Sequence, residues 1–445
     1  MAQHAFPRSF KTNYLKAERG EGIYIYDKDG KKYIDGCSGA LISNIGHGVP
    51  EIAEAIMAQL KKLEFAHTSR WQCDIVEEAA TMVADFAPKG LNNVWFGCGG
   101  SEAVESAIKL ARQYYYERDG GKTSKYITIS RWNSYHGSTL GTVAVGGNMA
   151  RRNVYAPMFL ETPKIAATYC YRCPFGLEQS SCGLKCGHQL ESEIRRIGPQ
   201  YVTSFIAEPI VGSTVGALLP PDGYWPLIRE ICDKYDILLI ADEVMTGGGR
   251  TGRNFALDHW NVVPDIIATA KGLAAGYVPS GAIIAKDELL EPLRKGSGGF
   301  MHGHTYHSNP VSAAAVVAVM KYIKEHKVVE NVRNVEHVLA NGLKKMESEN
   351  PIVGQVRGKG FMWGVELVKD KGSKAAFDRS VGAANVVTKE CIEQGLIIYP
   401  GSGMIDGLEG DNFLIAPPLV TTEAQMLDIM EKLSAGLSSA AKKLL

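Results

Sequence analysis

Short apolar runs alternate with segments of helical periodicity through the middle of the chain. Each run at 126–130, 202–207, 237–241 and 266–270 is brief and bounded by polar or turn residues, which predicts buried strands. A helix is predicted over 223–235, between two of these strands. Strands that alternate with helices are typical of an α/β fold with a mostly parallel sheet.

The two ends of the chain show other patterns. Residues 21–35 predict a hairpin, because apolar side chains alternate on both sides of an Asp29-Gly30 turn. Further helices are predicted at 50–63, 73–87 and 329–347, with one long helix from Ser312 and a last one from Thr422. Strands are predicted near 353–366 and 396–399.

Composition and charge narrow the class of protein. The 445 residues are 45% hydrophobic and 22% charged, which is ordinary for a globular protein of two or three domains. Lys and Arg together equal Asp and Glu, so we expect neither nucleic acid nor an anionic membrane as a partner. The N-terminus lacks the pattern of a signal peptide, and no apolar run is long enough to span a membrane. We expect a cytoplasmic protein.

Ionisable residues follow two of the predicted strands directly. Asp242 ends the first strand and Lys271 ends the second, and ligands of α/β sheets bind beyond these carboxyl ends. A desolvated lysine can form a Schiff base with an aldehyde cofactor, and an aspartate can pair with a pyridinium nitrogen, so pyridoxal phosphate is the obvious candidate. For an isolated pair, a loop-capping aspartate and a solvated lysine remain the alternative.

The motif around these two residues carries a family resemblance. The string DEVMTGGGRTG from Asp242 to Gly252, followed later by Lys271 in AKGL, resembles the class III pyridoxal-phosphate-dependent aminotransferases of the ω-amine:pyruvate type. The resemblance implies a fold-type I transferase with a large domain over 61–315 and a small α+β domain from both chain ends, 1–60 and 316–445. It also implies that Lys271 carries pyridoxal 5′-phosphate and moves the substrate proton, and that Asp242 keeps the cofactor ring protonated.

The glycine turn before residue 101 predicts a phosphate site. Gly100 and Ser101 open a predicted helix, whose N–H groups and dipole attract anions, although a simple helix cap would have the same sequence. The resemblance makes them the phosphate cup, with Gly99 in place of the family's first serine. By the same resemblance Tyr135 stacks on the cofactor ring, Val244 packs on its other face, and His136 and Glu208 lie near it.

The segment from Gly299 to Pro310 contains three histidines. His302, His304 and His307 could bind a metal, but no carboxylate or cysteine accompanies them. The segment resembles the family's GHTY motif, in which Thr305 reaches the phosphate in the neighbouring subunit. This implies a homodimer with shared active sites. The family also places the loop after Cys37 at the substrate mouth, with Leu41, Ser43 and Asn44 facing the cofactor.

Four of the nine cysteines lie close together in the sequence. They could bind a structural metal, form a cross-link, or pack a loop as reduced thiols, and catalysis needs no metal. These residues are Cys170, Cys173, Cys182 and Cys186.

One departure from the family bears on the substrate. Aligning Pro417-Pro418-Leu419 puts Leu414 where related enzymes carry an arginine that binds the substrate carboxylate. We therefore expect an amine donor whose reacting carbon is remote from any carboxylate, such as an ω-amino acid, a taurine-like amine or a diamine, and a keto acid such as pyruvate as acceptor. A racemase or epimerase on the same scaffold is the alternative.

Overall fold

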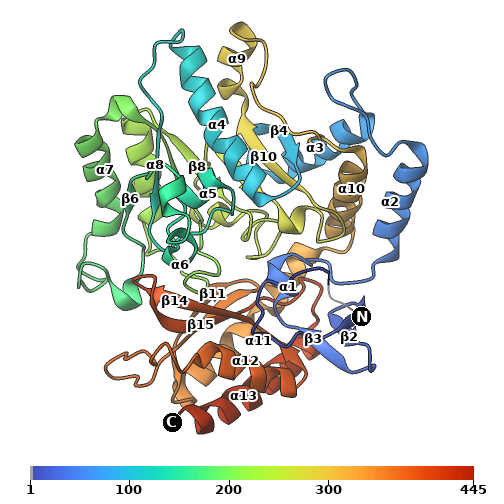
Figure 1. The fold of residues 1–445 in the computed structure, drawn as a ribbon, viewed down its shortest axis with the longest axis vertical. Coiled ribbons are helices and arrows are strands. Elements are labelled where there is room, and N and C mark those ends of the chain that lie inside the picture. The colour runs from blue at the N-terminus through green and yellow to red at the C-terminus, as the bar shows by residue number, and fades with distance from the viewer. Residues whose placement is uncertain (1–3) are drawn as a thin grey trace.

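A seven-stranded sheet forms the centre of the computed structural model, which describes residues 4–445 (Figure 1). The strand order is β4-β10-β9-β8-β7-β5-β6; β5 to β9 are parallel, whereas β10 runs antiparallel to both of its neighbours. The mostly parallel sheet expected from the sequence is confirmed. The strands are β4 (Leu91–Gly97), β5 (Ile127–Arg131), β6 (Lys164–Ile165), β7 (Val202–Ala207), β8 (Leu238–Asp242), β9 (Ile266–Thr269) and β10 (Gly281–Lys286).

Helices cover both faces of this sheet, which explains why its strands are continuously apolar. Leu239 of β8 packs into the core formed with Trp225 and Ile228 of α8, whereas its neighbour Ile240 packs into the core formed with α4. The helices that belong to this part are α3 (Asp74–Phe86), α4 (Gly100–Arg118), α5 (Leu140–Val145), α6 (Met149–Arg152), α7 (Lys185–Ile197), α8 (Tyr224–Lys234) and α9 (Glu291–Lys295).

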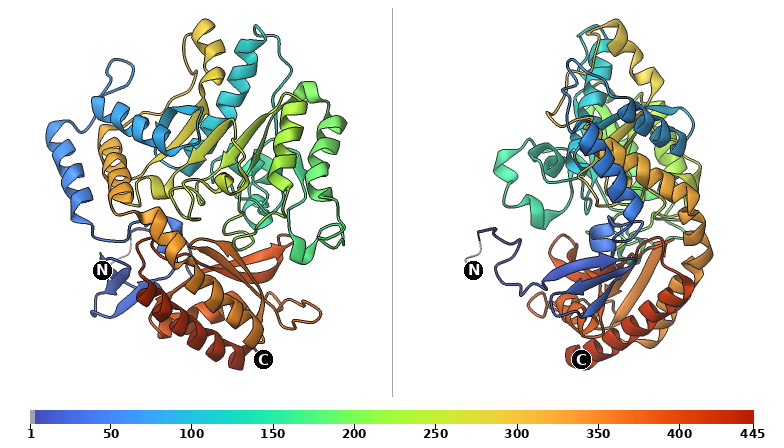
Figure 2. Two further views of the ribbon diagram at one scale, coloured as in Figure 1. Left: turned by 180° about the vertical axis from the view of Figure 1, so that it is seen from behind. Right: turned by 90° about the vertical axis from the view of Figure 1, so that its right-hand side faces the viewer.

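The two chain ends come together below the central sheet (Figures 1 and 2). The N-terminal hairpin pairs with the C-terminal strand β13 in parallel, and Ile23 and Ile34 share one core with α11 and α13. The small α+β part built from both ends is thus confirmed, while the domain boundaries after residues 60 and 315 stay a prediction. Its elements are β1 (Ala17–Glu21), β2 (Tyr24–Asp27), β3 (Lys32–Asp35), α1 (Ser38–Leu41), α11 (Val328–Glu349), β11 (Val353–Lys359), β12 (Met362–Leu367), α12 (Ala383–Glu393), β13 (Leu396–Ile397), β14 (Tyr399–Ile405), β15 (Glu409–Ile415) and α13 (Glu423–Leu444).

Two helices connect the large and small parts. α2 (Pro50–Lys62) and α10 (Pro310–Glu325) pack against each other along one side of the molecule. α10 starts two residues before Ser312, because Asn309 caps it by accepting hydrogen bonds from the N–H groups of Val311 and Ser312. Among residues 4–445, no helix has both the length and the apolar character needed to cross a membrane.

Two strand predictions for the C-terminal region were wrong in their boundaries. Residues 353–366 form two antiparallel strands, because Gly360 turns the chain with φ +57°, in a site where a Cβ would meet the carbonyl carbon of Thr251. Residues 396–399 belong to two different sheets, since β13 pairs with β3 and Tyr399 opens β14. The hairpin β14–β15 that follows lies beside the part of the molecule that contains the central sheet.

Candidate active site

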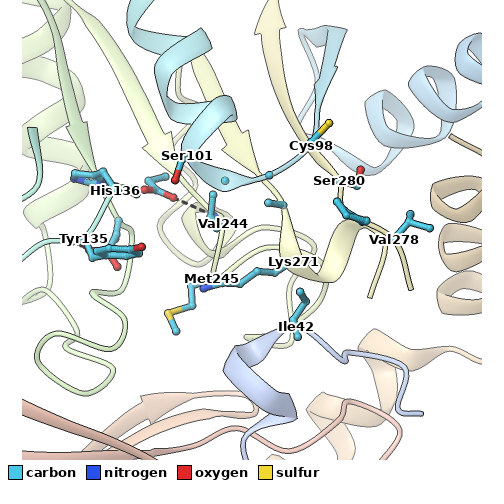
Figure 3. A pocket seen from close by; sticks show the side chains of 17 residues that line it. Ile42, Cys98, Ser101, Tyr135, His136, Val244, Met245, Lys271, Val278 and Ser280 are labelled. Atoms are coloured by element: carbon cyan, nitrogen blue, oxygen red, sulfur yellow. Dashed lines mark hydrogen bonds and ion pairs between the residues drawn. The ribbon is translucent and has the colours of Figure 1, made fainter. Parts of the chain in front are cut away.

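A cavity of about 230 Å³ lies at the carboxyl ends of β7, β8 and β9 (Figure 3). Its walls also include the start of α4 and the loop after β5. Apart from Thr305 and three residues of the loop after Cys37, the site residues predicted from the sequence line it: Gly100, Ser101, Tyr135, His136, Glu208, Asp242, Val244 and Lys271. Segments more than 150 residues apart in the chain thus meet at one edge of the sheet, as expected for ligands of α/β folds.

Lys271 projects into this cavity from the turn that follows β9 (Figure 3). Its backbone adopts φ +41°, which is unusual for a residue with a side chain and is characteristic of functional sites. Burial lowers the pKa of its amino group to about 8, although the carboxylates of Asp242 and Glu208 act in the opposite direction. A buried lysine with a pKa near neutrality is suited to act as a nucleophile and as a proton carrier.

Asp242 ends β8 and is held rigidly. One carboxylate oxygen lies 2.7 Å from Nδ1 of His136, and the other accepts a hydrogen bond from the N–H of Val244 at 3.1 Å. Both Asp242 and His136 are buried, and Nε2 of His136 has no hydrogen-bond partner among the described residues. The carboxylate of Asp242 is therefore held in a fixed position at the cavity wall.

The start of α4 forms a narrow cradle. A Cβ added at Gly100 would lie 2.8 Å from Cγ1 of Val244, and one added at Gly137 would lie 2.6 Å from Oγ of Ser101. Oγ of Ser101 accepts a hydrogen bond from the N–H of Ser138 at 3.0 Å. Only glycine permits this close packing of the helix start against Val244 and the loop after β5, and the helix start itself lines the cavity.

Glu208 follows β7 and supports the wall that carries Tyr135. Its carboxylate accepts hydrogen bonds from the N–H groups of Tyr135 at 2.9 Å and Gly212 at 2.8 Å, and burial raises its pKa. Arg131 donates to the backbone carbonyl of Glu208, and no arginine among the described residues bonds its carboxylate.

Comparison with known proteins decides the family. A family model described as Aminotransferase class-III matches residues 5–437. This chain belongs to the class III aminotransferases. It is therefore an enzyme that transfers amino groups, and its cofactor is pyridoxal 5′-phosphate.

Relatives of this class III aminotransferase cover almost its whole length. An uncharacterised aminotransferase of Bacillus subtilis, YodT, is 38% identical over 444 residues, 100% of this chain and 99% of the relative. The putrescine–pyruvate aminotransferase of Pseudomonas aeruginosa is 36% identical over 93% of this chain and 88% of its own. A solved structure of an (S)-enantioselective ω-transaminase from Thermomicrobium roseum is 34% identical, covers 98% of this chain and 96% of its own, and has a TM-score of 0.90. These are aminotransferases of the fold-type I class.

The cavity of this class III aminotransferase fits its cofactor. A flat ring needs a slot without bulky side chains, and Gly100 and Gly137, which line the cavity, bring no side chain into it. The ring nitrogen needs a buried acid, which Asp242 provides, and the aldehyde needs a poorly solvated lysine, which Lys271 provides. The phosphate needs the N–H groups of a helix start, and α4 begins at the same cavity.

The loop expected at the substrate mouth contributes a different residue. Leu41 is fully buried in an apolar cluster and Asn44 bonds Gly248 and Arg250, whereas Ile42 lines the cavity. Leu41 has φ +58°, so the chain turns there and the residue after it points toward the cavity. The prediction for Leu41, Ser43 and Asn44 was therefore wrong. Three residues that were not predicted also line the cavity, namely Cys98, Met245 and Ser280. Their closeness to motif residues in the sequence was the signal that could have suggested this position.

Thr305 is exposed and lies outside the cavity of its own chain. Of the histidines beside it, His307 stacks on Trp95 with ring centroids 5.3 Å apart, and His302 bonds Ser106 and Lys109. Packing and hydrogen bonding thus account for His302 and His307, whereas His304 packs beside Trp95 and His302 and its Nε2 has no hydrogen-bond partner among the described residues.

The four clustered cysteines come together in the structure. Cys170, Cys173, Cys182 and Cys186 line one small cavity of about 20 Å³, and none of them forms a disulfide. Nowhere in residues 4–445 do three cysteine, histidine or acidic side chains stand where they could hold a metal ion. A turn at Cys170 and the start of α7 at Lys185 set their backbone positions. This geometry agrees with thiols that pack a loop, and their chemical state stays a prediction.

Proposed function

We propose that this class III aminotransferase takes the amino group from an ω-amine, an ω-amino acid or a taurine-like donor and passes it to a keto acid such as pyruvate. The observation that carries the proposal is the position of Leu414, which lies in an apolar cluster beside the cavity. It is fully buried among Leu41, Met245, Met362 and Ala416, where an arginine would otherwise bind an α-carboxylate. The names of the relatives, a putrescine–pyruvate aminotransferase and an ω-transaminase, support the same substrate class.

The roles of the polar residues follow from their positions. Bound pyridoxal phosphate supplies an aldehyde that captures amines and a ring that accepts the electron pair released when a proton leaves. Lys271 would hold the cofactor, and its amino group, once released, would carry the proton to and from the substrate carbon. Asp242, oriented by His136, would keep the ring nitrogen protonated.

The remaining contacts would orient the cofactor. Ser101 and the N–H groups that begin α4 at Gly100 would bind its phosphate. Tyr135 would stack on one face of the ring and Val244 would pack on the other, with Glu208 fixing the backbone of Tyr135.

The homodimer belongs to this proposal as well. Thr305 is exposed and does not line the cavity of its own chain, which agrees with a role in the neighbouring subunit's phosphate site. Sedimentation of the loaded enzyme should give twice the 48.3 kDa mass of the chain. A monomer with full activity would rule out shared active sites. The cytoplasmic location stays a prediction.

The substrate class is tested by mixing cofactor-loaded enzyme with single amines in the absence of an acceptor. We expect an ω-amine or taurine-like donor to convert the cofactor stoichiometrically to its amine form, seen by absorbance, and pyruvate to reverse the change. Nothing observed favours the racemase alternative. Loss of optical activity from an amino acid without this conversion would establish it and refute the proposal.

Cofactor capture should depend on pH through Lys271. Only the unprotonated amine attacks an aldehyde, and the pKa of this amine in the free protein is lowered to about 8 by burial. The rate at which apoenzyme captures pyridoxal phosphate should therefore rise about tenfold per pH unit below 8 and level off above it. Stopped-flow absorbance measures this rate. A rate that continues to rise up to pH 10 would show that the lysine has an ordinary pKa.

A further inference from the structure

A second cavity, of about 390 Å³, lies next to the catalytic one and is lined mostly by polar groups. It is bounded by α6, the loop after β7, the start of α12 and the strand β14. Two arginines border it, Arg8 and Arg151, together with hydroxyl and amide side chains from Asn148, Ser213, Thr214, Asn385, Tyr399 and Ser402. One acid, Asp411, also lines it, and its carboxylate accepts the N–H of Ala384.

Arg151 connects this cavity to the catalytic one. Its guanidinium carbon lies 4.7 Å from the centroid of the Tyr135 ring, and Tyr135 lines the catalytic cavity. Thr214, on the wall of the second cavity, donates a hydrogen bond to the carbonyl of Asn133, two residues before Tyr135. The stacked pair of Arg151 and Tyr135 therefore stands between the two spaces.

The guanidinium of Arg151 is not committed to any other group. Among the hydrogen bonds and ion pairs of residues 4–445, Arg151 contributes only its backbone N–H, which bonds the side chain of Asn148. A half-buried guanidinium stacked on an aromatic ring keeps its N–H donors available for a planar anion.

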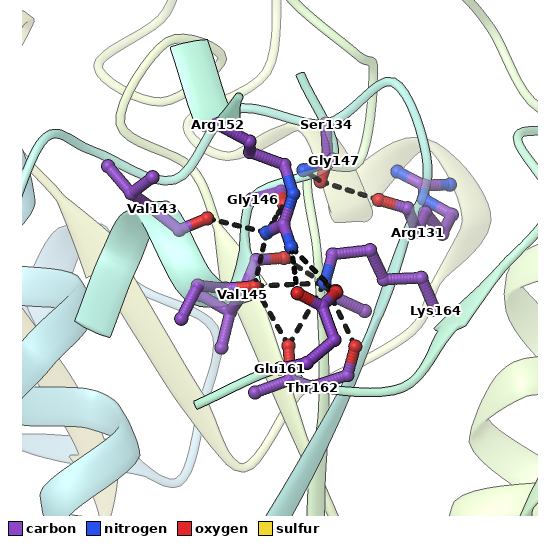
Figure 4. A network of polar contacts seen from close by, with 12 residues as sticks. Arg131, Ser134, Val143, Val145, Gly146, Gly147, Arg152, Glu161, Thr162 and Lys164 are labelled. Atoms are coloured by element: carbon purple, nitrogen blue, oxygen red, sulfur yellow. Dashed lines mark hydrogen bonds and ion pairs between the residues drawn. The ribbon is translucent and has the colours of Figure 1, made fainter. Parts of the chain in front are cut away.

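The neighbouring Arg152 shows the opposite situation (Figure 4). It is buried, donates to the carbonyls of Val143, Ala144 and Gly146, and pairs with Glu161. The N–H donors of Arg152 therefore stabilise its own loop and are not available to a ligand.

The other buried arginines of this region line neither cavity. Arg250 donates to the carbonyls of Ala416 and Pro417 and to the side chain of Asn44. Arg131 donates to the carbonyl of Glu208 and is fully buried beside Tyr224 and Trp225, where its Nε and Nη1 have no partner among the described residues. Arg151 is thus the cation that lines the second cavity beside Tyr135.

We propose that Arg151 binds an anionic group at the far end of the amine donor, while the amine reacts at Lys271. This inference rests on the proposed function and narrows its substrate class to amines that carry a remote carboxylate or sulfonate, as opposed to diamines or plain alkylamines. Arg8 adds a second positive charge at the border of the same cavity. Leu414 leaves no cation at the usual place, and Arg151 supplies one against the ring of Tyr135.

The test compares matched donors on loaded enzyme with pyruvate as acceptor. Each pair consists of an ω-amino acid and the alkylamine of equal carbon number, with taurine and ethylamine as the sulfonate pair. We expect wild-type enzyme to favour the anionic member. In Arg151→Ala the ratio of kcat/KM values, anionic over neutral, should fall about 10- to 100-fold through a higher KM for the anionic donor. Arg151→Lys should give an intermediate ratio, because it keeps the charge and loses the planar fork.

Two further variants separate binding from positioning. Arg151→Glu should invert the preference toward diamines, whose far end is cationic. Arg195→Ala, an exposed arginine on α7, should leave the wild-type ratio unchanged. If Arg151 acted only by holding Tyr135, every donor would lose activity equally and the ratio would not move.

The outcomes are distinguishable. A fall in the ratio for Arg151→Ala together with the inversion for Arg151→Glu supports the inference. An unchanged ratio, in enzyme that turns over both members of a pair, overturns it and leaves the proposed function intact. Wild-type enzyme that converts no ω-amine, anionic or neutral, overturns the proposed function and this inference with it.

Discussion

Lys271→Ala should abolish transamination, with kcat reduced at least about 10⁴-fold. The variant loses both the covalent attachment of the cofactor and the group that moves the substrate proton, and no second lysine lines the cavity. The turnover of an ω-amine with pyruvate, normalised to bound cofactor, measures the effect. Full activity in Lys271→Ala would refute the catalytic role assigned to this residue.

Two controls separate lost chemistry from lost folding. Borohydride reduction of loaded wild-type enzyme should add the cofactor mass to the peptide that contains Lys271, whereas the variant should gain no mass. A small amine such as methylamine should restore part of the proton transfer in the variant, since the cavity keeps the space of the deleted side chain. Lys295→Ala, an exposed lysine on α9, should keep wild-type turnover.

A low pKa alone does not identify Lys271 as catalytic. Burial lowers the pKa of Lys164 to about 8 as well, yet its amino group donates to the carbonyls of Ala144 and Thr162 and pairs with Glu161. What distinguishes Lys271 is its place at the end of β9, inside the cavity and facing a buried acid.

The central sheet and its strand-end residues could be predicted from the sequence because both depend on local patterns. Each strand is a short apolar run, and Asp242 and Lys271 follow two of these runs directly. The direction in which a parallel strand points then fixes which end of the sheet carries the ligand. The motif around Asp242 added the identity of the cofactor.

Features that depend on turns and distant packing could not be predicted in this way. Ile42 replaces Leu41 at the cavity because the chain turns there with positive φ at Ser38, Gly39 and Leu41. Gly360 divides one predicted strand into two. The contact between Arg151 and Tyr135 joins α6 to the loop that follows β5, and it exists only in the folded protein. The separation of two residues in the sequence does not show whether they touch. The sequence therefore could not distinguish Arg151 from Arg152 or from an ordinary surface arginine.

Asp242→Asn should reduce kcat about 10²- to 10³-fold, because the amide has nearly the same shape as the carboxylate but carries no charge to keep the ring nitrogen protonated. His136 lies 2.7 Å from the carboxylate oxygen and can bond the amide too, so the fold should persist. The kcat for an ω-amine, and the absorbance of the bound cofactor, measure the effect. Wild-type kcat in this variant would remove Asp242 from the mechanism.

The same substitution should change cofactor capture in the opposite direction. The Asp242 carboxylate raises the pKa of Lys271, so its removal should lower that pKa further below 8 and move the capture profile to lower pH. At pH 7 the Asn variant should therefore bind pyridoxal phosphate faster than wild-type enzyme and still turn over far more slowly. A misfolded site would lose both properties together. Asp265→Asn is the control, because it removes a buried carboxylate that pairs with Arg229 and Lys286 at the amino end of β9. This variant should leave the pH of half-maximal capture unchanged. Faster capture combined with slower turnover is the outcome that only a charge facing both the lysine and the ring can produce.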